Sequence, residues 1–434
     1  MKTVANKKMV RVAFHTLGCK LNQAETEYLV FQFRDDGYQV VADDDWADIY
    51  IVNTCTVTHI ADCKSRHVLR AAKRRNPLAI IIATGCYAQR APQQLTSLVD
   101  FVIGNKEKSS LLEIVRGLTL PTDFVKTTST KSRQNYTDSL RIRSLVKIQA
   151  GCYTPCSYCI VPKIRSYEYS APISMIIDEI DRKIALGYHE IVITGTKIGC
   201  YKYNNISLSE LIQRILAQTE IQRIRLSSLQ PQEITPQFLS LWHDNRLCRH
   251  FHLALQSGSD TVLHRMKRGY SVNNYRQAVS MIKETIPDVA ITTDVMVGFP
   301  GESDEEFEES YLCCEQIGFA GIHVFPFSIR QGTEAAEMPY QITDIVKNKR
   351  VHKMLKLANF CRRNFYMSFS GRILSVLWER ELYSGAGIYS GLTDNYVRVF
   401  TRSKDNLANR ATLTKLGEFN GKGIVSEIID ETFN

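Results

Sequence analysis

Three cysteines within eight residues are the feature that most constrains this chain. The run Cys152-Tyr-Thr-Pro-Cys156-Ser-Tyr-Cys159 directly follows residues 145–150, whose composition is typical of a β-strand. A 4Fe-4S cluster held fully by protein takes four thiolates, so three would leave one iron free to chelate a small ligand. The alternatives are scattered buried thiols or a zinc ribbon, which favours two Cys-x2-Cys pairs and finds no second pair nearby. The spacing therefore predicts an iron–sulfur loop at the end of a strand.

The 434 residues of the chain predict two or three domains. Twelve cysteines in a chain this long are typical of reduced thiols and metal ligands rather than of a disulfide scaffold. Apolar runs stay shorter than the roughly 18 residues of a membrane span, and Lys7, Lys8 and Arg11 are not followed by the apolar segment of an export signal. We therefore expect a cytoplasmic protein, a location that suits an oxygen-sensitive cluster.

The net charge of +9 is unevenly spread along the chain. Residues 64–75 carry six basic side chains and no carboxylate. Residues 347–363 carry seven basic side chains and again no carboxylate. Such runs are usually solvated helix faces. Two of them in one chain favour a polyanionic partner.

The first 117 residues alternate between strand and helix patterns. The strands are continuous apolar runs, which in such an alternation indicate a parallel sheet covered on both faces. We expect an N-terminal doubly wound parallel-sheet domain over residues 9–118. Its strands are expected at residues 10–14, 48–53, 79–83 and 101–103, and its helices at 22–34, 60–75, 92–98 and 106–117.

A second alternating series follows residues 119–143, a segment rich in Thr, Ser and Lys that we interpret as a linker. Six strand–helix units favour a partial, open (β/α)6 barrel over residues 144–368, with active residues at the C-terminal ends of its strands. The strands are expected at residues 145–150, 190–194, 223–229, 251–256, 289–297 and 321–327.

The pattern changes again after a basic helix at residues 347–367. Short alternating segments predict a small antiparallel β-barrel over residues 369–434. Its strands are expected at residues 372–378, 387–391, 395–401 and 423–429. The expected fold class is therefore α/β with a small β-barrel at the C-terminal end.

Three further cysteines, Cys19, Cys55 and Cys86, share one context, because each follows a predicted strand of the first domain. The carboxyl ends of parallel strands line one crevice of an open α/β sheet, so the three thiols are expected to converge on a second cluster. The alternative is that they are small buried side chains. The other six cysteines lack such a placement and are interpreted as core or surface thiols, although Cys200 follows a barrel strand and its role stays open.

The motifs Thr-Leu-Gly-Cys19-Lys-Leu-Asn, Asn-Thr-Cys55-Thr-Val-Thr and Thr-Gly-Cys86, with the Cys152 run, resemble those of the methylthiotransferases. These are radical S-adenosylmethionine (SAM) enzymes with a second, N-terminal cluster. Residues 389–396 are similar to part of that family's RNA-binding TRAM domain, and the resemblance covers nearly the whole chain. The sequence motifs around Cys19 and Cys55 most resemble those of the branch acting on threonylcarbamoyladenosine beside the tRNA anticodon. The isopentenyladenosine branch typically has Tyr-Gly-Cys-Gln-Met-Asn.

The resemblance implies SAM and two 4Fe-4S clusters as cofactors. The SAM-cleaving cluster would be held by Cys152, Cys156 and Cys159. The auxiliary cluster, which carries the sulfur to be donated, would be held by Cys19, Cys55 and Cys86. One SAM methylates that sulfur, and a second yields a radical that takes hydrogen from carbon 2 of the adenine, which then couples to the methylated sulfur. The implied partners are the tRNA anticodon stem-loop, a reductase or flavodoxin-type electron donor and a sulfur donor, with the enzyme acting as a monomer and without a membrane.

Strand ends and loops supply further candidates for binding SAM and substrate. Tyr158 would meet the SAM adenine, and Gly195 with Thr196 would let the backbone approach the amino group. The remaining SAM candidates are Ser228, Gln256 and Asp294. The substrate candidates are Arg165 and Lys197 for a carboxylate, and Tyr396 and Arg398 for RNA. For each of them, the alternative is an ordinary turn or cap residue.

Several other functions compete with this interpretation. The same chemistry acts on isopentenyladenosine tRNA or on an aspartate of a ribosomal protein in other branches of the family. A non-catalytic iron–sulfur RNA-binding protein would bind tRNA without consuming SAM. A radical SAM mutase or activase would leave the first domain and the C-terminal barrel without a use.

Overall fold

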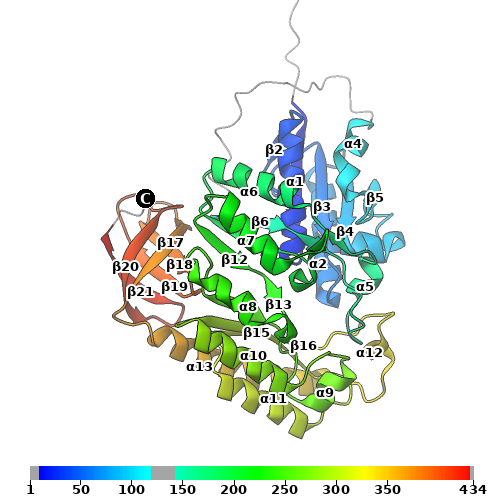
Figure 1. Cartoon of the computed structure of the whole chain (residues 1–434). Helices are drawn as coiled ribbons and strands as arrows, with labels where there is room; N and C mark the ends of the chain where they lie inside the picture. Colours follow the sequence, from blue (N-terminus) through cyan, green and yellow to red (C-terminus); the bar gives the residue numbers. More distant parts are fainter. Residues whose placement is uncertain (1–8, 119–141, 431–434) are drawn as a thin grey trace, which may run out of the picture.

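The computed structural model describes residues 9–118 and 142–430 and contains three structural units (Figure 1). An N-terminal α/β unit and a C-terminal β-barrel lie on different sides of a central strand–helix unit. The predicted linker falls almost entirely on residues 119–141, which lie outside the described residues. Among the described residues, no helix is both long and apolar enough to cross a membrane.

The N-terminal unit is a parallel sheet with the strand order β2-β1-β3-β4-β5, which confirms the predicted doubly wound fold. Buried apolar clusters pack on both faces, with Leu69 of α2 on one and Phe33 of α1 on the other. The strands are β1 (Arg11–Thr16), β2 (Gln39–Val41), β3 (Ile49–Thr54), β4 (Ile80–Gly85) and β5 (Phe101–Ile103). The helices are α1 (Lys20–Asp35), α2 (His59–Arg75), α3 (Cys86–Arg90) and α4 (Leu111–Arg116).

Two local elements of this unit differ from the prediction. The helix expected at residues 92–98 is only a 3-10 turn at Pro92–Gln94. Proline disfavours the helical conformation in the residue before it, and Ala91 accordingly lies outside the helical region, with φ = −143° and ψ = 64°. Strand β2 was not predicted, because its three residues begin with the polar Gln39 and leave an apolar run of only two.

The central unit contains six parallel strand positions arranged in sequence order, as the partial (β/α)6 barrel requires. Seven strands fill these positions, because β12 and β13 are two parts of one predicted strand, interrupted at Ser227. One sheet holds β6 (Arg143–Lys147), β9 (Glu190–Thr194) and β12 (Arg223–Leu226). The other holds β13 (Ser228–Leu229), β14 (His250–Leu253), β15 (Ala290–Val297) and β16 (Gly321–Pro326). The helices are α6 (Ile173–Ala185), α7 (Leu208–Gln218), α8 (Pro236–Leu239), α9 (Asp260–Arg265), α10 (Val272–Thr285) and α11 (Asp304–Ile317).

Short elements complete the central unit. Among them, α5 and the β7–β8 pair flank the Cys152 loop. These elements are β7 (Gln149–Ala150), α5 (Val161–Ile164), β8 (Tyr169–Ser170), β10 (Lys202–Tyr203), β11 (Ile206–Ser207), α12 (Glu334–Glu337) and the 3-10 helices at Ile198–Cys200, Pro231–Glu233 and Ser240–His243.

Helix α1 of the N-terminal unit packs directly on the barrel strands β6 and β9 (Figure 1). Ala24 of α1 shares a buried apolar cluster with Leu145 of β6 and Val192 of β9. The small alanine side chain allows the helix to approach the strands closely. Because α1 begins directly after Cys19, this packing fixes the position of that cysteine relative to the barrel.

The C-terminal unit is a closed five-stranded barrel with the order β17-β18-β19-β21-β20. Every pair is antiparallel, as in the predicted small antiparallel barrel, except β19 with β21, which is parallel. The strands are β17 (Ile373–Glu381), β18 (Ile388–Thr393), β19 (Arg398–Arg402), β20 (Ala411–Phe419) and β21 (Ile424–Asp430), and the long helix α13 (Asp344–Met367) leads into them.

Candidate functional site

The Cys152–Cys159 loop lies between β7 and α5, past the C-terminal end of β6. Gly151 precedes it with φ = 84°, a conformation that favours glycine. A Cβ on this residue would lie 1.6 Å from the carbonyl oxygen of Tyr167. The Gly151 amide donates a hydrogen bond to Thr196 Oγ1 at 3.1 Å. Glycine at this position therefore lets the chain that leads into Cys152 pass between the segments that carry Tyr167 and Thr196.

The three thiols of this loop are close enough to influence one another. Burial, together with the charges of Cys156 and Cys152, raises the pKa of Cys159 to about 12. Arg268, which lies between α9 and α10, places Nη1 3.3 Å from the Cys156 Sγ. A neighbouring cation favours the thiolate, which is the form that binds a metal. This donor set and its charge fit an iron–sulfur cluster.

The predicted SAM residues Tyr158, Gly195 and Thr196 gather around the same loop. The Tyr158 ring packs on an apolar cluster that contains Phe299, and its hydroxyl lies 3.5 Å from Arg268 Nη1. The Gln149 side chain accepts hydrogen bonds from the amide of Thr196 at 3.0 Å and from that of the next residue at 2.9 Å. This amide side chain therefore ties the end of β9 to the start of the cysteine loop.

Three buried polar atoms near the C-terminal ends of the barrel strands have no hydrogen-bond partner among the described residues. These atoms are Ser227 Oγ, Glu233 Oε1 and Gln256 Oε1. Gln256 also adopts a left-handed conformation with φ = 66°, which is strained for a residue other than glycine. Ser228, the predicted contact, is exposed, so Ser227 presents the buried hydroxyl of this pair. Unpaired buried polar atoms call for an unseen polar ligand, and SAM provides one.

Asp294 lies within β15, and its backbone carbonyl accepts a hydrogen bond from the Gln256 amide at 2.8 Å. Its carboxylate is 3.2 Å from His252 Nε2. Burial alone would raise the pKa of Asp294, but the hydrogen bond and charge of His252 outweigh it and lower that pKa. The structure therefore keeps Asp294 beside Gln256, one of the strand-end positions with which it was grouped on sequence.

Cys19, Cys55 and Cys86 follow β1, β3 and β4, so the three middle strands of the sheet bring them to one edge. Burial, followed by the charges of Cys86 and Cys19, raises the pKa of Cys55 to about 11. Partial burial also raises the pKa of the Cys19 thiol, although this side chain still reaches solvent. The three thiols therefore lie within electrostatic range of one another.

Glycines shape this edge as they shape the first loop. Gly18 and Gly85 precede two of the cysteines, with φ values of 99° and 95°. A Cβ on Gly18 would lie 2.7 Å from the Cys55 Sγ, so glycine leaves room for a thiol there. No three Cys, His, Asp or Glu side chains of residues 9–118 and 142–430 converge on a point that suits a single metal ion. A cubane fits better, because each of its thiolates binds a different iron.

The two groups of cysteines face each other across α5. Cys86 packs in a buried cluster with Ile160 and Ile164, and Ile160 directly follows Cys159. This contact joins the loop of one cysteine group to a member of the other. It places the two candidate clusters at opposite sides of one small region between the N-terminal unit and the barrel.

An ion cluster around Glu25 holds this region together. Glu25 of α1 accepts hydrogen bonds from Arg165 at 2.8 and 3.0 Å, from Lys108 at 2.6 Å and from Lys147 at 2.9 Å. Arg165 also donates to the side chain of Asn22 at 2.9 Å. The guanidinium of Arg165, predicted to bind a substrate carboxylate, is thus occupied by a carboxylate of the protein.

The other predicted substrate cation, Lys197, points toward the Cys152 loop. Its Nζ lies 3.4 Å from Thr154 Oγ1. The thiol of Cys200 reaches solvent, but the protein that partly surrounds it raises its pKa. The charge of Lys197 opposes this rise in the pKa, and the charge of Cys152 adds to it. Lys197 and Cys200 therefore belong to the surroundings of this loop.

Tyr396 of the C-terminal barrel reaches the central unit, whereas Arg398 does not. Tyr396 has φ = 67° and its ring stacks on His250 at 4.3 Å, with the Arg225 guanidinium 5.0 Å from the ring centre. Arg398 pairs with Glu379 inside its own barrel. Tyr396 therefore contacts the strands of the central barrel, whereas Arg398 is paired with a carboxylate of the C-terminal barrel.

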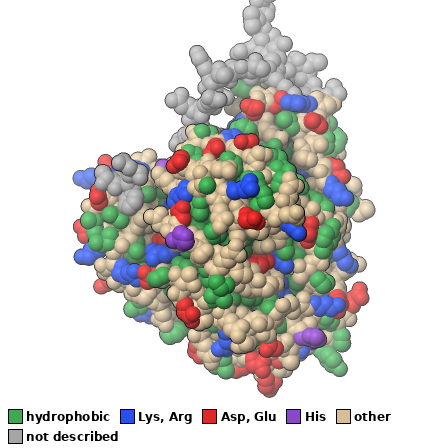
Figure 2. Space-filling model, in the orientation of Figure 1, with side chains coloured by type: hydrophobic (Ala, Val, Ile, Leu, Met, Phe, Trp, Pro, Cys, Tyr) green, Lys and Arg blue, Asp and Glu red, His purple; other side chains and the backbone are tan. Residues whose placement is uncertain are grey.

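The two basic runs differ in their surroundings. On α13, Arg350 pairs with Glu302 and Asp304, and Lys353 pairs with Glu308, so carboxylates from around α11 neutralise two cations of this run. On α2, Lys73 and its two basic neighbours are exposed. Over the face shown in Figure 2, Lys and Arg side chains are interspersed with Asp and Glu. The helix α2 is the better candidate for contact with a polyanion.

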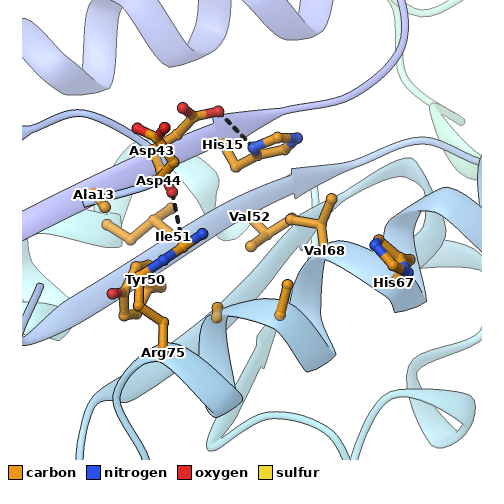
Figure 3. Close-up of a pocket in the computed structure, with 12 residues that line it drawn as sticks. Ala13, His15, Asp43, Asp44, Tyr50, Ile51, Val52, His67, Val68 and Arg75 are labelled. Carbon is orange, nitrogen blue, oxygen red and sulfur yellow. Dashed lines mark hydrogen bonds and ion pairs between the residues drawn. The ribbon is translucent and has the colours of Figure 1, made fainter. Parts of the chain in front are cut away.

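A cavity of about 120 Å³ lies within the N-terminal unit, and none of the residues that line it is a cysteine (Figure 3). Its walls come from β1, β3 and α2, and include Val52 and Val68. His15 pairs with Asp43 at its rim at 2.7 Å. With mostly apolar walls and no thiol, this cavity has no part in the chemistry of the cysteines.

Sequence reasoning missed two residues that shape the site, Arg268 and Glu25. Arg268 lies more than one hundred positions from Cys156, so no local motif links the two. Glu25 lies on the predicted helix after Cys19 and looks like an ordinary exposed carboxylate. Only the docking of α1 on the barrel reveals that it is buried among three cations.

The parallel barrel with a thiol loop at a strand end defines a radical SAM protein, here with a second set of thiols in an N-terminal unit. Residues 146–314 match the Radical SAM superfamily, and residues 11–104 match a family described as Uncharacterized protein family UPF0004. The Threonylcarbamoyladenosine tRNA methylthiotransferase MtaB of Bacillus subtilis (strain 168) is 34% identical over 423 residues, 94% of each chain. The protein of the same name from Aquifex aeolicus (strain VF5) is 36% identical over 407 residues, 90% of this chain and 96% of its own. The chain belongs to the radical SAM methylthiotransferase family.

Relatives named for another substrate are also similar. The tRNA-2-methylthio-N(6)-dimethylallyladenosine synthase of Methylacidiphilum infernorum (isolate V4) is 30% identical over 408 residues, 89% of this chain and 87% of its own. Among solved structures, the radical SAM methyltransferase TsrM from Kitasatospora setae matches with a TM-score of 0.54 and 14% identity, over 76% of this chain and 74% of that chain. This likeness shows a shared fold. Family membership makes the chain an enzyme rather than a non-catalytic iron–sulfur protein.

Proposed function

We propose that this enzyme inserts a methylthio group at carbon 2 of N6-threonylcarbamoyladenosine next to the tRNA anticodon. Relatives that carry this substrate in their names are 34% and 36% identical to the chain. Three relatives named for dimethylallyladenosine are 30% to 32% identical. One further relative named for threonylcarbamoyladenosine is 30% identical, so the two ranges overlap. Four of the five relatives named for threonylcarbamoyladenosine are nevertheless 34% to 36% identical, above all three of the others, which favours the substrate that the motifs around Cys19 and Cys55 indicate.

The observation that carries the proposal is the meeting of two cysteine groups across α5. Cys86 of one group packs on Ile160, the residue after Cys159 of the other. A reaction that combines a radical with a sulfur atom needs both sources beside one substrate. In the proposal, Cys152, Cys156 and Cys159 hold the SAM-binding cluster, and Cys19, Cys55 and Cys86 hold the sulfur-bearing one. When bound, these clusters supply the radical from SAM and the sulfur to be transferred.

The residues around the Cys152 loop would position SAM. Tyr158 offers a ring directly beside Cys159, and Gly195 with Thr196 brings backbone close to the loop. Ser227 Oγ and Gln256 Oε1 are buried acceptors without a protein partner among the described residues. Arg268, with Nη1 3.3 Å from the Cys156 Sγ, would place a positive charge beside the cluster.

The Glu25 cluster would keep the two cysteine groups at a constant separation. Arg165 comes from the loop after Cys159, and Glu25 comes from the helix that begins after Cys19. Their bond therefore ties a segment next to one cysteine group to a segment next to the other. Reactive groups must stay within a fraction of an ångström of a productive arrangement, so a rigid link between them serves catalysis.

We further propose that tRNA binds through exposed cations of α2 and through the C-terminal barrel, where Tyr396 and Arg398 are the candidates. Exposed Lys73 and its neighbours offer contacts to phosphates. The proposed reaction also requires a reductase or flavodoxin-type electron donor and a sulfur donor. The proposed enzyme is a cytoplasmic monomer, because a single chain carries both cysteine groups and its substrate is tRNA.

Mass spectrometry of tRNA nucleosides from a strain that lacks the gene tests the proposal. We expect loss of the 2-methylthio form of threonylcarbamoyladenosine, with the unmethylthiolated nucleoside retained. The methylthio form of isopentenyladenosine should be unchanged. Loss of that second nucleoside alone, or loss of a modification on a ribosomal protein alone, would assign the enzyme to another branch of the family.

A further inference from the structure

Lys20 is a cation beside Cys19 that forms no ion pair within residues 9–118 and 142–430. It is the first residue of α1, and Cys19 is the N-cap of that helix. A positive charge at this end of a helix gains nothing from the helix, because the dipole there is also positive. Its side chain is exposed to solvent although it faces the central barrel. A group outside the helix must therefore account for any favourable interaction of this ammonium.

The position of Lys20 is set by the docking of α1 on β6 and β9. The ammonium lies within electrostatic range of side chains from β14, β15, β16 and the C-terminal barrel. These are His250, Asp294, His323 and Tyr396. Lys20 therefore projects into the space between the barrel and the proposed sulfur-bearing cysteines.

The other ionic groups around this space already have partners. Arg225 of β12 pairs with Glu190 at 2.8 Å, and Arg143 of β6 pairs with Glu379 at 2.8 Å. Asp294 pairs with His252, as described above. Lys20 is the one cation near these groups, within the described part of the chain, that an incoming anion meets without displacing a protein carboxylate.

We propose that Lys20 binds the carboxylate of the threonylcarbamoyl group and thereby selects this substrate. The inference rests on the proposed function. Carbon 2 and N6 lie on the same edge of adenine, so a base whose carbon 2 faces the edge of the sheet that carries Cys19 would direct its N6 substituent toward neighbouring side chains. An ammonium donates charge-assisted hydrogen bonds to a carboxylate. An isopentenyl group has no charge and leaves the ammonium without a partner.

The structure favours Lys20 over the two cations suggested by the sequence. Arg165 is bound on both terminal nitrogens by Glu25 and Asn22. Lys197 approaches Thr154 of the SAM-side loop. Arg165 therefore has its partners already, and Lys197 lies beside the SAM-side loop rather than beside Cys19.

The test is a binding cycle with two anticodon stem-loop RNAs, one bearing threonylcarbamoyladenosine and the other its carboxylate methyl ester. Fluorescence anisotropy under anaerobic conditions gives the affinities of both RNAs for the reconstituted full-length protein. The parent should prefer the free acid by about 10- to 150-fold, the range expected for hydrogen bonds to a charged group. Lys20→Gln should abolish this preference, and Lys20→Arg should retain most of it.

Lys356→Gln is the matched control, because it removes one exposed cation from α13, outside the barrel. It should leave the acid-to-ester ratio unchanged even if both affinities fall. A Lys20→Gln protein that keeps the acid preference, or weakens acid and ester equally while the parent prefers the acid, would overturn the inference. Loss of the preference in Lys20→Arg would also overturn it. Failure of the proposed function is distinguishable, because the parent itself would then not methylthiolate the acid-bearing RNA.

Discussion

Replacing Glu25 with glutamine tests whether the ion cluster holds the N-terminal unit against the barrel. The side chain of Glu25 is 7% exposed, and those of its partners Arg165 and Lys108 are 2% and 6% exposed. Removing one member of a buried charged pair costs about 3–5 kcal/mol, because the other charge stays buried without compensation. Arg165 is the buried cation that Glu25 meets across the contact, so this range is expected for the free energy of opening the contact in Glu25→Gln.

Hydrogen exchange of the amides in α1 and β6 measures that free energy directly. A loss of 3–5 kcal/mol corresponds to exchange that is faster by about 150- to 5,000-fold at these amides, up to the limit set by opening of the whole contact. Glu113→Gln on α4 is the control, because its exposed carboxylate has no ion-pair partner among the described residues. That change should shift the opening free energy by less than about 0.5 kcal/mol.

The effect of Glu25→Gln should also depend on pH. Burial alone would raise the pKa of Glu25, but the charges of Lys108, Arg165 and Lys147 hold that pKa well below its ordinary value of 4.5. A lowered folded-state pKa gives stability that is present above the unfolded pKa and lost as the pH falls through the folded pKa. The difference between parent and variant should therefore be full at pH 7 and shrink below about pH 4.5. Equal exchange rates at pH 7, or a difference that grows with acid, would refute the reasoning.

Three further predictions concern the clusters and the RNA. Anaerobically reconstituted protein should bind about eight irons per chain, and alanine at all three cysteines of the Cys152–Cys159 loop should halve that number; zinc, or four irons in the parent, would contradict it. Gly151→Ala should reduce iron binding, because its Cβ would lie 1.6 Å from a carbonyl oxygen at a φ of 84°, whereas Gly269→Ala meets nothing within 4 Å and should behave like the parent. Alanine at residues 73–75 should flatten the salt dependence of tRNA affinity by up to about 0.9 per lost phosphate contact on duplex-like RNA. An unchanged slope would make α2 an ordinary solvated face.

The sequence allowed prediction of features that depend on local patterns. Apolar runs such as Ile49–Thr54 are buried on both faces of a parallel sheet, so their composition indicates their structure. The cysteines following β1, β3 and β4 could be grouped because parallel strands bring their carboxyl ends together. Both inferences need only the order of strands and helices.

The features that escaped prediction depend on how distant elements pack. Arg350 looks like part of a basic surface in the sequence, but Glu302 neutralises it in the fold. Arg165 looks like a cation available to substrate, but α1 brings Glu25 against it. Charge runs show which side chains are ionic, whereas their partners come from other helices and strands and cannot be inferred from spacing.

The central claim is that this enzyme methylthiolates threonylcarbamoyladenosine through two separate cysteine groups. Its most direct test is an anaerobic assay with SAM, reductant and a sulfide source, and with tRNA bearing either threonylcarbamoyladenosine or isopentenyladenosine. Nucleoside mass spectrometry should find the methylthio product on the first tRNA and almost none on the second. Cys19→Ala should still form 5′-deoxyadenosine but give no methylthio product. Equal conversion of the two tRNAs, conversion of the isopentenyl form alone, or methylthio product from Cys19→Ala would contradict the account.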